Sequence, residues 1–206
     1  MTTLLIADDQ TLIRTALATM LGLEADLEVV GQAGTCGEAV RVAGETQPDV
    51  VLLDVQMPDG GLGVDDGIDA IPGMLAVAPS ARIVVVTTFG RPGYLRRALE
   101  QGAVGFLVKD TPVDRLVESI RRVAQGLRAV DPELAAASLS IGASPLTQKE
   151  ALVLAASAGG ASTVEIAQSV HLSEGTVRNY LSSAIGKLGS RNRAEALRTA
   201  TDNGWV

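Results

Sequence analysis

The 206-residue sequence predicts an α/β protein in which a five-stranded, doubly wound parallel sheet is followed by a small all-α domain. Three observations lead to this fold class. Short apolar runs rich in β-branched residues recur in the first part of the chain, and amphipathic helical patterns separate them. From about Gly126 onward only helical periods remain.

The predicted strands are short and apolar on both faces. They cover residues 4–7, 50–53, 83–86 and 104–108, with a weaker strand at 27–31. Continuous apolar runs of this length are typical of parallel strands that helices cover on both sides. The clearest helical segment has one apolar face, made of Val113, Leu116, Val117, Ile120, Val123 and Ala124. The alternation of such strands and helices predicts a flavodoxin-like sheet.

The domain division follows from a change in composition. Residues 1–126 hold the alternation of strands and helices, and residues 127–143 form an Ala- and Ser-rich linker. Residues 144–206 form the predicted helical domain. Four short helices are expected there, because suitable N-cap residues recur at Thr147, Ser162 or Thr163, Ser173, and Ser190 or Asn192.

The net charge of −7 is unevenly distributed. Residues 1–143 hold 11 Lys and Arg against 19 Asp and Glu, whereas residues 144–206 hold 6 against 5. Lys and Arg supply affinity for nucleic acid by neutralising phosphates, so the second part is the candidate for DNA binding.

Composition also argues against several classes of protein. With one cysteine, Cys36, and one histidine, His171, neither an internal disulfide nor a zinc site nor a Cys/His catalytic pair is expected. No apolar run has the length of a membrane span, and the N-terminus lacks the pattern of a secretion signal. We therefore expect a cytoplasmic protein that does not enter the membrane.

Polar side chains follow the predicted strands at one edge of the sheet. The first strand ends in Asp8 and Asp9, the third in Asp54, the fourth in Thr87 and the fifth in Lys109. These ends converge in a doubly wound sheet. Three carboxylates held together repel one another unless a cation neutralises them, which favours Mg²⁺. One carboxylate could then attack phosphorus while an ammonium stabilises the phosphoryl oxygens; singly, each acidic residue could equally be a helix cap or a solvated loop residue.

The motifs LLIADDQ, VVLLDVQMP, VVVTT and GFLVKD, in this order over residues 1–126, resemble the receiver domain of bacterial response regulators. The resemblance implies that Asp54 is the phosphoacceptor. It also implies an acidic pair at Asp8 and Asp9 and a Mg²⁺ site to which Asp9, Asp54 and the backbone carbonyl of Gln56 contribute ligands. Thr87 and Lys109 would be the residues that respond to the phosphoryl group. Phe106 occupies the position of the switch aromatic, although a core aromatic is an equally good interpretation.

Two features depart from the family pattern. The stretch DGGLGVD, between Pro58 and Asp66, makes the loop after the phosphoacceptor several residues longer than usual. Such a loop could alter kinase access or phosphoaspartate lifetime, and an inert surface insertion is the alternative. Lys109 is followed by Asp110, where many receivers have proline.

Residues 162–188 read as two helices separated by a turn at 171–173, which is the pattern of a helix-turn-helix motif. The exposed face of the second helix offers side chains that can contact DNA: Thr176, Arg178, Asn179, Ser182 and Ser183, with Lys187 further along. An ordinary amphipathic helix pair has the same periodicity. However, SPLTQKE, VEIAQSVHLSEGTVRNYLS and KLGSRNRAEA resemble the LuxR-type domain of the NarL/FixJ subfamily, and the pattern is closest to DesR-like members.

The two resemblances together imply a transcriptional response regulator of a two-component system and not an enzyme. A sensor histidine kinase would phosphorylate Asp54, and phosphorylation would promote a homodimer that binds promoter DNA. Related regulators pair through the first and fifth receiver helices, here residues 11–22 and 112–125. Two alternatives stay open: a Mg²⁺-dependent phosphohydrolase with an aspartate nucleophile, and a non-phosphorylated scaffold with constitutive DNA binding.

Overall fold

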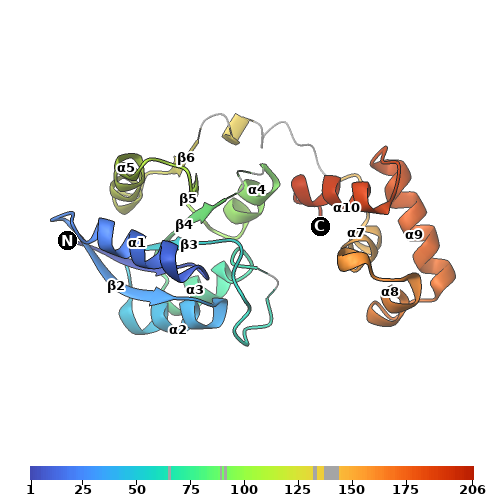
Figure 1. Ribbon diagram of the computed structural model, residues 1–206, viewed down its shortest axis with the longest axis horizontal. Coiled ribbons are helices and arrows are strands. Elements are labelled where there is room, and N and C mark those ends of the chain that lie inside the picture. The colour runs from blue at the N-terminus through green and yellow to red at the C-terminus, as the bar shows by residue number, and fades with distance from the viewer. Residues whose placement is uncertain (65, 89, 91, 132–133, 137–143) are drawn as a thin grey trace. The chain divides into compact units, whose positions relative to one another are not determined.

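The computed structural model describes residues 1–206 except 65, 89, 91, 132–133 and 137–143, and it divides the chain into two compact units (Figure 1). The first unit comprises residues 1–90 and 95–135, and the second comprises residues 91–94 and 136–206. Most of the predicted linker, 127–143, lies outside the described residues.

The first unit is built on a parallel sheet in the order β2-β1-β3-β4-β5-β6. The strands are β1 (Thr2–Ala7), β2 (Leu27–Ala33), β3 (Val50–Leu53), β4 (Arg82–Thr87), β5 (Gly105–Val108) and β6 (Ala129–Val130). All neighbouring strands are parallel, which confirms the predicted fold class. Among the residues that the structure describes, the sheet has six strands where five were predicted. Ala129 is buried and its backbone N–H donates to the carbonyl of Val104, so a two-residue edge strand follows the last helix.

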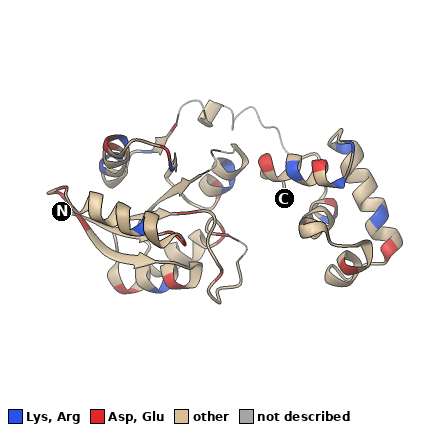
Figure 2. Cartoon of the chain, viewed as in Figure 1, with Lys and Arg blue, Asp and Glu red and all other residues tan. Residues whose placement is uncertain are grey.

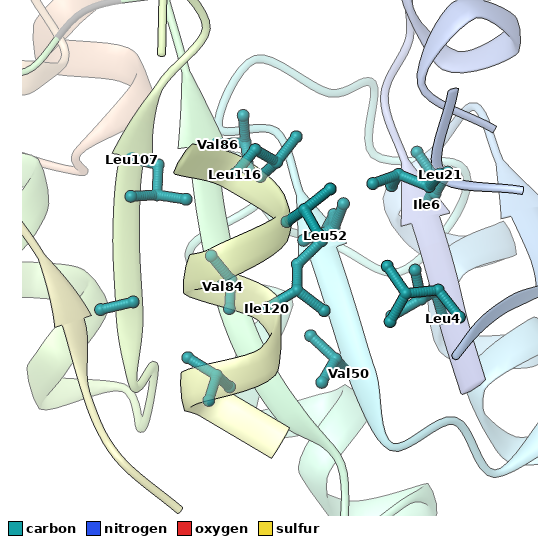
Figure 3. Close-up of a cluster of buried hydrophobic side chains, with 14 residues drawn as sticks. Leu4, Ile6, Leu21, Val50, Leu52, Val84, Val86, Leu107, Leu116 and Ile120 are labelled. Carbon is teal, nitrogen blue, oxygen red and sulfur yellow. The ribbon is translucent and has the colours of Figure 1, made fainter. Parts of the chain in front are cut away.

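Helices cover both faces of this sheet. They are α1 (Thr11–Leu21), α2 (Cys36–Thr46), α3 (Ile71–Val77), α4 (Pro92–Glu100) and α5 (Val113–Ala124). Alternate strand residues such as Ile6, Leu52 and Val84 meet Leu21 of α1 and Ile120 of α5 in one apolar cluster (Figure 3). Helices α2 and α3 cover the opposite face (Figure 1). Burial of apolar surface on both faces stabilises the sheet and aligns the carboxyl ends of its strands at one edge.

The second unit holds four α-helices among the residues described: α7 (Gln148–Ala155), α8 (Thr163–Ser169), α9 (Glu174–Lys187) and α10 (Arg193–Asp202). Each begins after a predicted cap whose side chain accepts a backbone N–H three residues on, namely Thr147, Ser162, Ser173 and Asn192. His171 adopts a positive φ of 53° in the turn between α8 and α9, and Leu172 donates back to Ala167. This turn is the one predicted from the sequence.

The core of the second unit is separate from that of the first. It includes Val153, Ile166, Val177 and Leu181, with the single tryptophan, Trp205, packed against them. Across the described part of the chain, no helix is both long and apolar enough to cross a membrane.

Candidate functional site

Three aspartates meet at the carboxyl edge of the sheet. Asp8 and Asp9 follow β1 and Asp54 follows β3; the backbone N–H of Asp54 donates to Ala7 O at 2.8 Å, which fixes the neighbouring strand ends. One oxygen of each carboxylate lies within 4.8 Å of the others. Asp8 and Asp54 are each 3% exposed, whereas Asp9 is exposed. The predicted convergence of these three residues is present in the structure.

Lys109, directly after β5, joins two of these carboxylates. Its Nζ lies 2.7 Å from Asp8 Oδ2 and 3.0 Å from Asp54 Oδ2. Burial acts to lower the pKa of the Lys109 ammonium, but hydrogen bonds to the two carboxylates outweigh it and the pKa is raised. The pKa of Asp54 is also raised, because burial outweighs the hydrogen bond from Lys109. The pocket therefore holds two buried negative charges that one ammonium compensates only in part.

The donor set fits a hard divalent cation. Asp54 Oδ1 is buried and has no hydrogen-bond partner among the described residues, so a strong acceptor is left unsatisfied. Together with oxygens of Asp8 and Asp9 it offers the all-oxygen environment that Mg²⁺ prefers. Gln56 lies two residues beyond Asp54 on the same loop, where its backbone carbonyl is the predicted further ligand.

Thr87 and Phe106, the two other predicted residues of this site, differ in their surroundings. Thr87 ends β4 and is 1% exposed, and its carbonyl accepts the backbone N–H of Lys109 at 2.8 Å. This bond holds the ends of β4 and β5 together. Phe106 is fully buried within β5, so in this structure it is part of the core.

The long loop after Asp54 is folded on itself. The Asp59 carboxylate accepts the backbone N–H groups of Gly61, Gly63 and Val64, and these bonds lower its pKa. The backbone carbonyls of Pro58 and Asp59 accept from the first residues of α2, at 2.8 and 2.9 Å. The loop is thus attached to α2 by its backbone.

Two basic residues near the pocket were not predicted from the sequence. Arg97 of α4 makes two 3.0 Å bonds to the Asp66 carboxylate and a 2.8 Å bond to Asp69, which ties α4 to the start of α3. Arg14 of α1 donates to the backbone carbonyl of Asp8. The sequence signal for Arg97 was weak, since it consisted only of acidic residues before α3 and a basic residue in α4. Arg14, the single charged residue of α1, was the stronger clue.

The second candidate site is the outer face of α9. Val177, Leu181 and Ala184 are buried against the core, while Arg178, Asn179 and Ser182 are exposed. Thr176 is half-buried, and its hydroxyl shares a 2.8 Å hydrogen bond with the cap residue Ser173. Arg178 makes only a loose contact of 3.6 Å with Glu174 on the same helix, so its guanidinium is available to a ligand.

Lys187 has a different environment from the other predicted DNA contacts. Its Nζ lies 2.7 Å from Oε2 of Glu150, a residue of α7 that is 4% exposed. Figure 2 shows the Lys and Arg of α9 and α10. Arg191 pairs with Glu195, and Arg193 donates to the carbonyl of Ala161.

A receiver-like acidic pocket in one unit and a helix-turn-helix in the other define a class of protein, and comparison of the sequence with protein families gives the same class. The chain belongs to the two-component response regulators with a LuxR-type DNA-binding domain: the response regulator receiver domain matches residues 4–121, and the luxR family of bacterial regulatory proteins matches residues 144–200. The resemblance inferred from the motifs is confirmed.

Particular relatives cover the whole chain. The transcriptional regulatory protein DesR of Bacillus subtilis is 40% identical over 205 residues, covering 100% of this chain and 99% of DesR. The uncharacterized transcriptional regulatory protein YvfU of the same organism is 38% identical over 203 residues, or 98% of each chain. The solved complex of the response regulator RcsB with DNA has a TM-score of 0.67 and 25% identity, with 98% of each chain covered. These relatives are regulators, in agreement with the prediction that the chain is not an enzyme.

Proposed function

We propose that Asp54 accepts a phosphoryl group from a sensor histidine kinase, and that this modification drives dimerisation and promoter binding. Residues 1–126 would carry the phosphoryl chemistry, residues 127–143 would link the domains, and residues 144–206 would bind DNA. The observation that carries the proposal is a buried oxygen of Asp54, beside Lys109 and two further aspartates, that has no hydrogen-bond partner in the described part of the chain.

The transfer step follows from the pocket. An oxygen of Asp54 attacks the phosphorus of the phosphohistidine, the new O–P bond forms as the P–N bond breaks, and the imidazole nitrogen leaves with the electron pair. Mg²⁺, bound by Asp8, Asp9, Asp54 and the Gln56 carbonyl, would supply electrostatic stabilisation of the phosphoryl oxygens. Lys109 stands 3.0 Å from the accepting carboxylate and supplies a further positive charge.

The response to phosphorylation would begin at Lys109 and Thr87. In the unmodified pocket Lys109 is held by Asp8 and Asp54. A phosphoryl group on Asp54 presents new acceptor oxygens that compete for this ammonium and for the Thr87 hydroxyl. Since the two residues are joined through their backbones, we expect the ends of β4 and β5 to respond together.

The proposed dimer face lies on α1 and α5. Leu12 is 81% exposed, Ala16 one turn later is exposed, and Leu23 beyond the end of the helix is 81% exposed. Val113 at the start of α5 is 39% exposed. Exposed apolar side chains at helical spacing favour a protein partner, and a second copy would also bring two DNA-binding domains to paired half-sites.

On DNA, α9 would enter the major groove. Arg178 can bond to guanine and Asn179 to adenine, while Thr176, Ser182 and Lys187 were predicted as further contacts. The exposure of Arg178, Asn179 and Ser182 supports this assignment.

The first experiment measures intact mass after incubation with Mg²⁺ and a small phosphodonor. We expect one added phosphoryl group on the natural chain and none on Asp54→Asn. Asp59→Asn, which alters a half-buried aspartate in the neighbouring loop, is the control and should still be modified. Labelling that persists in Asp54→Asn would refute the assignment of the acceptor.

Dimerisation is tested by sedimentation of the phosphorylated chain. We expect Leu12→Arg to stay monomeric while still accepting a phosphoryl group, and Val77→Arg, at a 41% exposed residue of α3, to dimerise as the natural chain does. If Asp54→Asn left dimerisation and regulated transcription unchanged, the chain would act as a constitutive DNA-binding scaffold. Sustained turnover of small phosphate esters would instead favour the phosphohydrolase.

A further inference from the structure

Glu150 is a buried carboxylate outside the phosphoryl pocket. It stands at the third position of α7, where its Oε2 accepts the backbone N–H of Thr147 at 2.7 Å and completes a capping box. The same carboxylate reaches α9: Ser183 donates to Oε1 at 2.6 Å and Lys187 to Oε2 at 2.7 Å. One side chain therefore joins the start of α7 to the second half of α9.

The second capping box shows what a cap alone requires. Glu165 makes the same reciprocal contacts with Ser162 at the start of α8. However, it is exposed, and within the described structure none of its hydrogen bonds reaches α9. The contacts of Glu150 with Ser183 and Lys187 thus exceed what capping of α7 needs. Those hydrogen bonds hold the pKa of Glu150 at about 2, so the carboxylate is ionised near neutral pH.

The rotation of α9 about its axis separates Lys187 from Arg178, the residue proposed to contact guanine. At about 100° per residue, Lys187 lies roughly 180° around the helix from Arg178, and Ser183 lies roughly 140° from it. Lys187 and Arg178 therefore point to opposite sides of α9. A side chain on the α7 side is badly placed for the groove that Arg178 enters.

We infer that Glu150 is a positioning residue for DNA binding: by holding Ser183 and Lys187 it fixes the rotation of α9, so that Arg178 and Asn179 meet the base edges. Lys187 then braces the helix and does not contact a phosphate, which revises its role in the sequence-based prediction. The inference rests on the proposed contacts of Arg178 and Asn179. A buried carboxylate that is paired with a lysine suits this task, because few other arrangements satisfy its hydrogen-bonding capacity.

The test compares specific and non-specific DNA binding by the full chain. The probe is a fluorescent duplex that the natural protein selects from a random-sequence pool, with an unselected duplex as competitor. Glu150→Gln removes a negative charge near the DNA, so electrostatics alone predicts tighter binding. Positioning predicts the opposite: about five- to tenfold weaker binding to the selected duplex and a lower specificity ratio. Glu165→Gln is the matched control and should keep the specificity ratio.

Salt dependence separates bracing from phosphate contact. Loss of a phosphate contact makes the slope of log affinity against log salt shallower by about 0.9. We expect Lys187→Gln to leave the slope unchanged while lowering specific affinity, and Lys187→Arg to restore it. Ser183→Ala loses one hydrogen bond and keeps the ion pair, so it should weaken specific binding by a few fold. It replaces any other variant that tryptophan fluorescence shows to be unfolded.

Unchanged or tighter specific binding by both Glu150→Gln and Ser183→Ala would overturn the inference, and so would a slope reduced by about 0.9 in Lys187→Gln. Failure of the underlying DNA contacts is a separate result. It would appear as normal specific binding by Arg178→Gln.

Discussion

Replacing Lys109 by alanine removes the one cation that contacts both buried carboxylates of the pocket within the described structure. Asp8 and Asp54 are each 3% exposed, and Lys109 Nζ lies 2.7 and 3.0 Å from their oxygens. Without this ammonium the two carboxylates repel each other in a poorly solvated site. We expect the Lys109→Ala receiver to lose stability at neutral pH.

The magnitude is limited by the cost of protonating one carboxyl group. The ordinary pKa of aspartate lies about three units below pH 7, and each unit is worth about 1.4 kcal/mol, so the ceiling is about 4 kcal/mol. Burial already raises the pKa of Asp54, so protonating this carboxyl at pH 7 costs less than the ceiling. The expected loss in the free energy of unfolding is therefore about 2–4 kcal/mol. A carboxyl whose folded pKa is raised favours folding when protonated. The loss should therefore shrink to about 1 kcal/mol near pH 5, where protonation is easier.

Native-state hydrogen exchange of β1 and β3 amides measures this effect in the receiver alone. Lys149→Ala, at an exposed lysine of α7, is the control and should leave these amides unchanged. Millimolar Mg²⁺ should stabilise Lys109→Ala more than the natural chain, because the cation replaces the lost charge. A loss that is equal at pH 7 and pH 5, or that does not respond to Mg²⁺, would refute the reasoning from carboxylate repulsion.

Four further substitutions have expected outcomes. Gly37→Ala would place a Cβ 2.4 Å from the backbone oxygen of Gly60, so a thermal melt should show destabilisation by about 1–3 kcal/mol. In the same helix, Gly44→Ala meets its nearest neighbour at 3.5 Å and should stabilise by up to about 1 kcal/mol; equal melting temperatures for both variants would contradict the contact. Arg97→Gln breaks the link from α4 to two aspartates, and amides of α4 should exchange faster, by about 1–3 kcal/mol in opening free energy, whereas unchanged exchange would mean that the link is unimportant. The pKa of Glu150 is lowered from 4.5 to about 2, so its contribution to stability is present above pH 4.5 and is lost as the pH falls toward 2. Glu150→Gln should reduce the pH dependence of unfolding in this window, as followed by fluorescence of the single tryptophan. An unaltered pH profile would count against the assignment.

Much of the receiver could be predicted from the sequence, because its elements are specified locally. Four of the five predicted strands are short apolar runs. The rule that parallel strands end at one edge then places Asp8, Asp54 and Lys109 together without any knowledge of side-chain contacts. The helix caps were likewise visible, since capping depends on residues three positions apart. The sixth strand was missed, because two residues at Ala129–Val130 make too short a run to show a period.

Contacts between helices could not be predicted in the same way. Arg97 meets Asp66 across 31 residues, and Lys187 meets Glu150 across 37. Their pairing depends on how the helices pack, and a basic residue on a helix surface gives no sign of which partner it will meet. The exposed face of α9 suggested DNA contacts for Arg178 and Lys187 alike, and only the packing of α7 against α9 distinguishes them.

Hydrogen-bond partners also distinguish a carboxylate that is available for chemistry from one that holds the structure together. Asp54 and Glu150 are both buried and both bonded to a lysine. Both oxygens of Glu150 accept hydrogen bonds, so its bonding capacity is directed to holding two helices together. Asp54 keeps one oxygen without a partner among the described residues, beside two more carboxylates. A buried acceptor left unsatisfied costs free energy in the resting protein, and the proposed binding of Mg²⁺ would recover it. We therefore expect chemistry at Asp54 and positioning at Glu150, although the two side chains carry the same functional group.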